Sequence, residues 1–229
     1  MLNKLKLEHH QKKYLRETIL VWAVVILVIH VLSVLQGMSS IILQILGSLS
    51  AIVLIYPPVL LAMFQKRDIP YWQINRSVFL HNLKWGMVAV GAVFPAAFVV
   101  NHFYQSLVWG VFYHPATTQI WLSYTTTQLL LVAFPEEFFF RGYMQGNLNR
   151  ILPPQNKFMG VPFGWAQILT AIFFAFSHSI IHVQWWHVFI FFPALVFSWL
   201  KEKTGTIWAA VLFHATCNVF SFWVVASYG

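Results

Sequence analysis

The chain has 229 residues, of which 59% are hydrophobic and only 9% charged, and its mean hydropathy is +0.68. Soluble globular domains carry about 25% charged residues, so this composition excludes a soluble globule and indicates a protein that crosses a membrane several times. The net charge of +8 does not indicate a nucleic-acid partner, because the basic residues form short clusters between apolar runs.

Seven apolar runs approach the length of about 20 residues that a helix needs to cross the hydrocarbon core. They cover Thr18–Leu35, Ser39–Phe64, Trp85–Phe103, Tyr124–Leu148, Gly164–Val183, Trp185–Leu200 and Thr206–Ser227. Pro57-Pro58 is expected to kink or end the second run. The aromatic segment Tyr104–Trp121 is expected to be interfacial or re-entrant, which would make eight membrane elements. The sequence thus predicts an all-α, polytopic transmembrane helix bundle, with residues 1–229 forming a single integral-membrane domain.

The basic residues predict the orientation of the bundle. Thirteen of the fourteen Lys and Arg residues lie in the tail 1–17 or in alternate connections, whereas the connections Gln36–Met38, Tyr104–Gln119 and the one near Gln184 contain none. Cytoplasmic segments of membrane proteins are enriched in Lys and Arg. The basic N-terminal tail, residues 1–17, is therefore predicted to be cytoplasmic and the C-terminus external. No small-residue cleavage site follows Val21–Leu35, which is interpreted as a retained span.

Two adjacent carboxylates, Glu136 and Glu137, lie inside the fourth run, and Arg141, the fourteenth basic residue, follows them. A charge at the bilayer centre costs at least about 2.5–3.5 kcal/mol, so such charges are usually paired or functional. Glu137 and Arg141 are four residues apart, which puts them on one helix face where they can form an ion pair. A buried pair that only fixes helix packing would leave Glu136 unexplained, because it lies about 100° round the helix.

Polar residues also interrupt the fifth and seventh runs. His178 follows Phe174 by one turn in the fifth run, and His214 shares a helix face with Asn218 in the seventh. A lone intramembrane histidine is more often a hydrogen-bonded packing residue than a ligand. Here, however, these polar groups and Glu136 are predicted to lie within about one and a half turns of the membrane centre. Three helices would then present polar side chains to one hydrated pocket.

Such a pocket would contain the groups needed for peptide hydrolysis. Glu136 can take a proton from water and deliver it to the leaving amine. The imidazoles and the Asn218 amide can orient that water or donate to the oxyanion. Glu136, His178 and His214 also match a His₂Glu zinc site with an open position, although the chain lacks a His-Glu-x-x-His helix. We expect a mechanism without a metal or other cofactor, with zinc on these three residues as the alternative.

Three motifs resemble those of the CAAX prenyl protease and bacteriocin-processing family of intramembrane proteases, also called the ABI family. They are, in the family's order, Glu136-Glu137-x-x-x-Arg141, Phe174-x-x-x-His178 and His214-x-x-x-Asn218. The resemblance covers about Tyr124 to Phe222, so it implies a catalytic core within residues 124–222. It also implies a glutamate-dependent protease in which Glu136 activates water and His178 assists. In that scheme His214 and Asn218 stabilise the oxyanion, and the site is shaped by Glu137, Arg141 and Phe174.

The resemblance further implies a setting and a class of substrate. Family members trim prenylated C-termini, process peptides or confer immunity to them, or cleave C-terminal sorting helices of surface proteins. We therefore expect a multi-pass protein of a bacterial inner membrane whose partners are the lipid bilayer and a membrane-bound protein or peptide substrate. Two other functions stay open on the sequence alone. Intramembrane Glu, His and Arg also mark proton- or cation-coupled transporters, and a non-catalytic immunity or scaffold protein would use the cluster only for packing.

Overall fold

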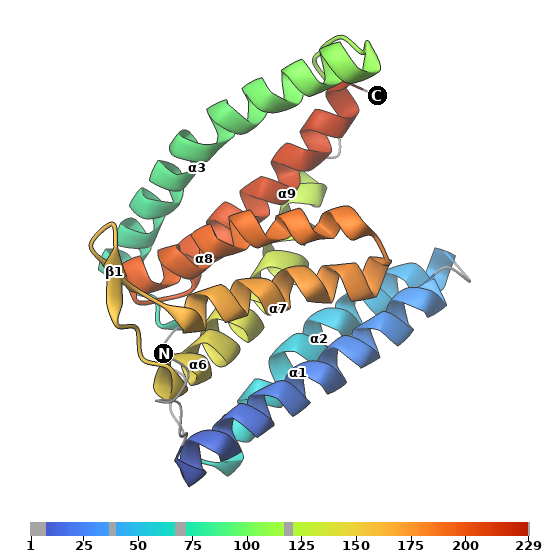
Figure 1. The fold of residues 1–229 in the computed structure, drawn as a ribbon. Helices are drawn as coiled ribbons and strands as arrows, with labels where there is room; N and C mark the ends of the chain where they lie inside the picture. Colours follow the sequence, from blue (N-terminus) through green and yellow to red (C-terminus); the bar gives the residue numbers. More distant parts are fainter. Residues whose placement is uncertain (1–7, 37–39, 67–71, 117–120, 229) are drawn as a thin grey trace.

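The computed structural model describes residues 8–36, 40–66, 72–116 and 121–228, and nearly all of them are helical (Figure 1). The elements are α1 (His9–Gln36), α2 (Ser40–Phe64), α3 (Arg76–Tyr104), η3 (Gln105–Trp109), α4 (Trp121–Thr127), η4 (Gln128–Ala133), α5 (Phe134–Glu137), η5 (Phe138–Met144), α6 (Gln145–Ile151), β1 (Asn156–Phe158), β2 (Val161–Phe163), α7 (Trp165–His182), η6 (Trp185–Ile190), α8 (Phe191–Thr204) and α9 (Trp208–Tyr228). The predicted all-α helix bundle is confirmed.

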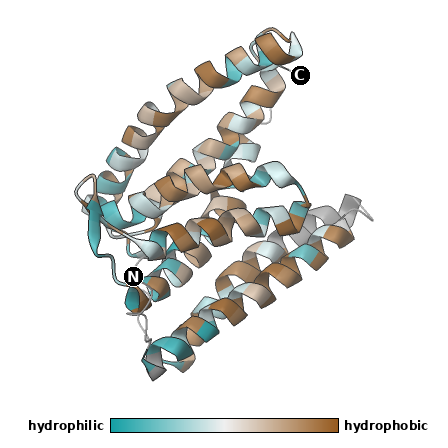
Figure 2. Ribbon diagram, viewed as in Figure 1, coloured by the Kyte–Doolittle hydropathy of each residue, from teal (hydrophilic) through white to brown (hydrophobic). Residues whose placement is uncertain are grey.

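The long helices lie side by side, with α7 packed against α8, α8 against α9, α9 against α3, and α1 against both α2 and α7. In Figure 1, α1, α3, α7 and α9 all begin at the end of the bundle that contains β1, and the C-terminus lies at the opposite end. Hydrophobic residues cover most of the helix lengths, whereas hydrophilic residues gather around β1 and the start of α1 (Figure 2). This distribution is what a bundle embedded in a bilayer requires.

Within the described residues, four helical stretches are long and apolar enough to span a membrane. They are Gln11–Leu35, Arg76–Trp109, Trp165–His182 and Trp208–Tyr228, which correspond to the first, third, fifth and seventh predicted runs. In the second run, the apolar stretch Leu49–Phe64 forms the C-terminal part of α2. The sixth run is divided between the 3₁₀ helix η6 and the 14-residue helix α8. A multi-pass membrane protein is therefore supported, with a span count that depends on the shorter helices.

Two local details differ from the sequence predictions. Helix α1 begins at His9, so it includes half of the predicted tail 1–17. Helix α2 does not end at Pro57-Pro58 but continues to Phe64. The segment Tyr104–Trp121 is divided locally: a π-helical turn extends α3 to Trp109, an irregular stretch follows, and a new helix begins at Trp121. Its interfacial or re-entrant position stays a prediction. Residues 37–39, 67–71 and 117–120, on which parts of the predicted connections fall, lie outside the described residues.

A short β-hairpin joins α6 to α7, where the sequence predicts only a cytoplasmic loop. Strands β1 and β2 pair antiparallel, and Phe158 lies opposite Val161. The two residues between them, Met159 and Gly160, both have positive φ, at 50° and 77°. Two-residue hairpin loops of this kind match the twist of the strands. Trp199 of α8 donates its indole N–H to the Phe158 carbonyl at 3.3 Å and so holds the hairpin against the bundle.

The fourth predicted run is one helical segment from Trp121 to Ile151 with two π-helical parts, η4 and η5. Between them, Glu136 and Glu137 lie on the single α-helical turn α5, next to Pro135. Proline has no N–H, so an α-helical hydrogen bond is lost here, and the adjacent backbone adopts wider π turns. In the first of these, the N–H of Phe134 reaches back five residues to the Leu129 carbonyl. Such π turns frequently mark functional sites.

Glu202 is the centre of a polar network near the end of α8, two residues beyond the predicted sixth span. Its Oε1 accepts hydrogen bonds from Gln145 at 2.8 Å, Asn149 at 2.7 Å, Gln167 at 3.3 Å and Lys201 at 2.9 Å. Burial alone would raise the pKa of Glu202, but the charge of Lys201 and the hydrogen bonds from Lys201, Gln145 and Asn149 hold it below its ordinary value of 4.5. The ionised carboxylate therefore ties α6, α7 and α8 together.

Because its folded-state pKa is lowered, Glu202 should stabilise the protein above pH 4.5, and this contribution should be lost as the pH falls through the lowered pKa. We expect Glu202→Gln to lower the unfolding free energy at pH 7 by about 1.5–3 kcal/mol, the usual contribution of a hydrogen bond to a charged group. The two proteins should converge at low pH. Unfolding of detergent-solubilised protein across pH measures this, with Glu8→Gln at the exposed start of α1 as the control. A pH-independent difference would contradict the prediction.

Candidate active site

Glu136 faces two histidines from two other helices. Its Oε2 atom lies 3.8 Å from Nε2 of His178 on α7 and 3.8 Å from Nε2 of His214 on α9. The Glu136 and His178 side chains are 19% and 23% exposed, whereas His214 is 5% exposed. Oε2 is buried and has no hydrogen-bond partner among the described residues. Atoms 3.8 Å apart are too distant for a direct hydrogen bond but close enough for one water molecule to contact both.

In each of these two histidines, the other ring nitrogen, Nδ1, already has a hydrogen-bond partner. Nδ1 of His178 lies 2.9 Å from the carbonyl oxygen of Phe174, and Nδ1 of His214 lies 2.9 Å from Oε1 of Glu137. Carbonyl and carboxylate oxygens only accept hydrogen bonds, so we assign the proton to Nδ1 in both rings. In the neutral imidazoles, both Nε2 lone pairs then point to the space beside Glu136.

Glu137 and Arg141 form the ion pair that their spacing predicts. Nη1 of Arg141 donates to Oε1 of Glu137 at 3.0 Å, and both side chains are 0% exposed. Nη2 of Arg141 donates to the Ala194 carbonyl of α8 at 3.2 Å. Because the same Oε1 also binds Nδ1 of His214, Glu137 is more than a packing partner of Arg141. His214 lies between two carboxylates, Glu137 on its Nδ1 side and Glu136 on its Nε2 side.

Aromatic rings of α7 and α8 hold these groups in place. Phe174 of α7 is 1% exposed, and its ring lies 4.2 Å from the Arg141 guanidinium carbon, 4.6 Å from the His178 ring and 5.7 Å from the His214 ring. Phe197 of α8 stacks on His214 at 4.8 Å and lies 4.8 Å from the Arg141 guanidinium carbon. Phe174 therefore packs against the Arg141 guanidinium and both imidazoles, and its site-shaping role stays a prediction. Phe197 is a second aromatic residue in this packing, and no motif indicates it.

Asn218 lies one helical turn beyond His214 and has a partner that the sequence does not indicate. Its Nδ2 donates to Oε1 of Gln128 at 2.7 Å. An amide nitrogen carries two hydrogens, so one N–H of Asn218 stays available to another acceptor. Gln128 ends the polar stretch Thr125–Gln128, just before the apolar residues that lead to Glu136, and no motif identifies it.

His187 of η6 is also close to the site, although it belongs to no motif. Its Nδ1 lies 3.1 Å from the His178 carbonyl oxygen, and its ring lies 6.2 Å from the His178 ring. On its other side, the ring of His182 lies 5.7 Å away. The segment that follows α7 therefore brings His187 close to His178, the histidine that faces Glu136.

The atoms around Glu136 can be compared with a zinc site. The donor set of one carboxylate and two imidazoles is that of known His₂Glu sites, and the Glu137 carboxylate on Nδ1 of His214 resembles the partners that orient metal-binding histidines. In a tetrahedral site with bonds of about 2.0–2.2 Å, ligand atoms are about 3.3–3.6 Å apart, a little closer than the 3.8 Å measured here. Among the described residues, no group of three or more such side chains is arranged to hold an ion without adjustment.

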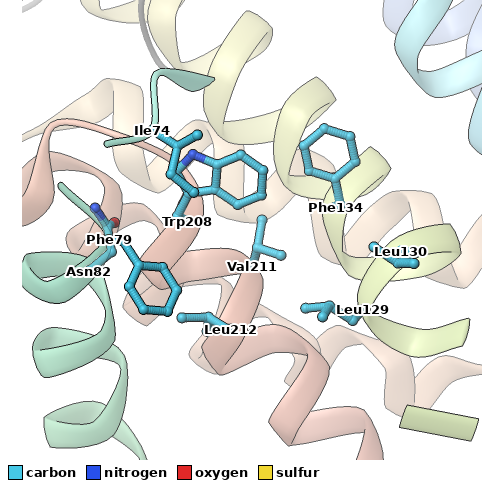
Figure 3. Close-up of a pocket in the computed structure, with 9 residues that line it drawn as sticks. All are labelled: Ile74, Phe79, Asn82, Leu129, Leu130, Phe134, Trp208, Val211 and Leu212. Atoms are coloured by element: carbon cyan, nitrogen blue, oxygen red, sulfur yellow. The ribbon is translucent and has the colours of Figure 1, made fainter. Parts of the chain in front are cut away.

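An apolar pocket of about 290 Å³ lies behind the site, between the start of α3, the η4–α5 segment and α9 (Figure 3). Phe134 lines it, and Glu136 follows two residues later; Leu212 lines it, and His214 follows two residues later. Residues two apart point to nearly opposite faces of a helix. The pocket therefore shares α5 and α9 with the polar site, but Glu136, His178 and His214 are not among the residues that line it.

The chain was compared with known proteins. Residues 117–220 match the family model described as type II CAAX prenyl endopeptidase Rce1-like. This region contains Glu136, Glu137, Arg141, His178, His214 and Asn218. Comparison with curated proteins and with solved structures found no match.

Proposed function

Because residues 117–220 belong to the type II CAAX prenyl endopeptidase Rce1-like family, we propose that this protein is an intramembrane endopeptidase in which Glu136 activates the attacking water. The observation that carries the proposal is the meeting of Oε2 of Glu136 with Nε2 of His178 and of His214, each at 3.8 Å. Three residues from three separate segments converge where one water molecule can be held and deprotonated.

In the proposed reaction, Glu136 takes one proton from this water, and the water oxygen attacks the carbonyl carbon of the scissile peptide bond. A C–O bond forms while the carbonyl π electrons move to oxygen, which gives a tetrahedral oxyanion. Glu136 then passes its proton to the leaving nitrogen, and the C–N bond breaks. The products are a carboxylic acid and an amine, and Glu136 is again ionised. Neutral His178 accepts a hydrogen bond from the water through Nε2 and so orients it.

His214 and Asn218 are the proposed donors to the oxyanion. Nδ1 of His214 is bound to Glu137, so Nε2 can donate only when the ring is an imidazolium, and the Glu137 carboxylate at 2.9 Å supplies the counter-charge for that form. Asn218 uses one N–H on Gln128 and has the second for the oxyanion. Each such donor typically contributes about 10²–10³ to kcat.

A metal-dependent version of the site would use the same residues. Zinc would be held by Glu136, His178 and His214, and it would supply Lewis-acid polarisation of the peptide carbonyl and of bound water. We favour the version with water alone, since Glu136 is then free to carry the proton from water to the leaving nitrogen. In the purified protein, activity that survives chelation and a metal content far below one per chain would support it. Activity that is lost on chelation and restored by zinc would overturn it.

The substrate is proposed to be membrane-bound: a lipidated C-terminus, a peptide precursor or a C-terminal sorting helix. The enzyme would act in the inner membrane of a bacterium. A transporter would need Glu136 for ion flux rather than for cleavage, so flux measurements in liposomes separate the two functions. A non-catalytic immunity or scaffold protein would keep its full biological effect in a Glu136→Gln variant.

The proposal predicts that His178→Ala and His214→Ala each lower cleavage by about 100-fold or more, because each removes a group that contacts the water or the oxyanion. Cleavage would be followed by mass spectrometry on membrane-anchored reporters that end in each of the three substrate types. His81→Ala, which removes an exposed histidine of α3, is the matched control. If His178→Ala or His214→Ala cleaved the reporters at the wild-type rate, the role assigned to that residue would be contradicted.

A further inference from the structure

On the side of Glu136 that leads toward α6, the protein is closed. All nine residues from Glu137 to Gln145 are buried. Beyond them, Glu202 accepts hydrogen bonds from Asn149, Gln167 and Lys201 as well as Gln145, which joins three helices across the end of the bundle. A peptide could enter from this end only by breaking both the aromatic packing and this network.

On the other side of Glu136, the described residues are more exposed and include several polar side chains. Along α7, Ser177 is buried, His178 is half-buried and His182 is exposed. Along α9, Phe213 to Ala215 are buried, and the five residues from Thr216 to Phe220 are half-buried. The hydrogen-bonded amides of Gln128 and Asn218 lie on this side too.

A row of histidines leads from the site to the same end. The His178 and His187 rings are 6.2 Å apart, and the His187 and His182 rings are 5.7 Å apart. Imidazoles and amides are costly to place against hydrocarbon, and in membrane proteins such groups line water-filled cavities. The histidine row and the two amides therefore favour a hydrated mouth at this end, defined here as His178, His182, His187, Gln128 and Asn218.

The basic residues show which side of the membrane the closed end faces. That end contains the start of α1 and α3, the hairpin and the end of α8, with Lys12, Arg76, Lys157, Lys201 and Lys203 among their residues. Nζ of Lys203 lies 4.3 Å above the Trp85 ring, so the basic end of α8 packs against the first half of α3, where Lys84 is also located. Lys and Arg mark the cytoplasmic side. The closed end is therefore cytoplasmic, and the mouth is extracytoplasmic.

We propose that the active site opens through this mouth to the extracytoplasmic face, and that the substrate presents its scissile bond from that face. The substrate class is then a segment of a translocated protein or peptide, such as the membrane-proximal tail of an exported protein, rather than a cytosolic lipidated tail. The identity of the substrate rests on the proposed peptidase function; the sidedness of the mouth does not.

Cysteine accessibility tests the sidedness without any activity. Cys217 is the only cysteine, so Cys217→Ser gives a background without thiols, and an unchanged melting temperature shows that this protein folds like the wild type. Into it we would place His187→Cys in the mouth and Ser198→Cys on the closed side, where Ser198 is fully buried. His182→Cys and Arg150→Cys, both exposed, report the two faces. A membrane-impermeant maleimide would be applied to spheroplasts and to inside-out vesicles.

We expect His182→Cys and His187→Cys to react in spheroplasts, Arg150→Cys to react only in inside-out vesicles, and Ser198→Cys to react at least tenfold more slowly than His187→Cys in both. Reaction of His187→Cys only from the cytoplasmic side, or equal reaction rates of His187→Cys and Ser198→Cys, would overturn the proposal. Cleavage of a reporter by the Cys217→Ser protein, in which every residue of the mouth is unchanged, tests the peptidase function separately. Labelling from outside without any cleavage would sink the proposed function and leave the sidedness intact.

Discussion

Replacing Glu136 by Gln is expected to lower the rate of peptide hydrolysis by a factor of about 10²–10⁴, the usual contribution of a positioned acid–base group. Gln has the same shape as Glu but cannot take a proton from water. Its amide can still contact water held near the Nε2 atoms of His178 and His214, so substrate binding should change less than kcat. Initial rates of reporter cleavage by purified protein in liposomes measure the effect, with kcat and KM determined separately.

Two further variants sharpen this result. Glu136→Asp keeps the acid but withdraws it by one methylene, and a displacement of about 1 Å can cost about 10²-fold, so partial activity is expected. Glu8→Gln makes the same chemical change at the exposed start of α1 and should leave the rate unchanged. If Glu136→Gln keeps more than a tenth of the wild-type kcat, Glu136 is not the base.

Replacing Arg141 by Met is expected to destabilise the protein by about 3–5 kcal/mol, because removing one partner of a buried ion pair leaves the other charge uncompensated. Arg141 is 0% exposed, it donates to Glu137 and to the Ala194 carbonyl, and it lies against the Phe174 and Phe197 rings. Met fills part of the volume but supplies no donor. Unfolding of detergent-solubilised protein measures the loss, and Arg150→Met, at the exposed end of α6, should change it by less than about 0.5 kcal/mol.

The double variant Glu137→Gln with Arg141→Met separates stability from activity. It removes both charges, so it should recover part of the stability lost in Arg141→Met. The amide oxygen that replaces the Glu137 carboxylate can still accept from Nδ1 of His214, but it supplies no counter-charge for the imidazolium. We therefore expect a more stable protein whose kcat stays at least tenfold below that of wild type. Recovery of wild-type kcat would reduce Glu137 to a packing partner of Arg141.

The helices follow from local sequence, because the length and hydrophobicity of a run decide whether it can cross a bilayer. Some local features of the helices and their connections cannot be predicted from the pattern of hydrophobic residues. Pro57-Pro58 falls inside α2, and Pro135 lies between two π turns rather than at a helix end. The hairpin consists of two three-residue strands in a polar connection, too short to show a period of two.

The sequence by itself determined which residues are out of place in a membrane and therefore need partners: Glu136, Glu137, Arg141, His178, His214 and Asn218. It also determined the Glu137–Arg141 pair, since that contact depends only on spacing within one helix. Their catalytic roles stay predictions until the variants are measured.

Only the tertiary structure decided how these residues combine. His214 lies between the two carboxylates, Asn218 pairs with Gln128, and His187 approaches His178. Each of these arrangements joins different segments of the chain. Such contacts depend on the rotation and depth of each helix. Packing of large side chains sets both quantities, as the stacking of Phe197 on His214 illustrates, and no local pattern encodes them.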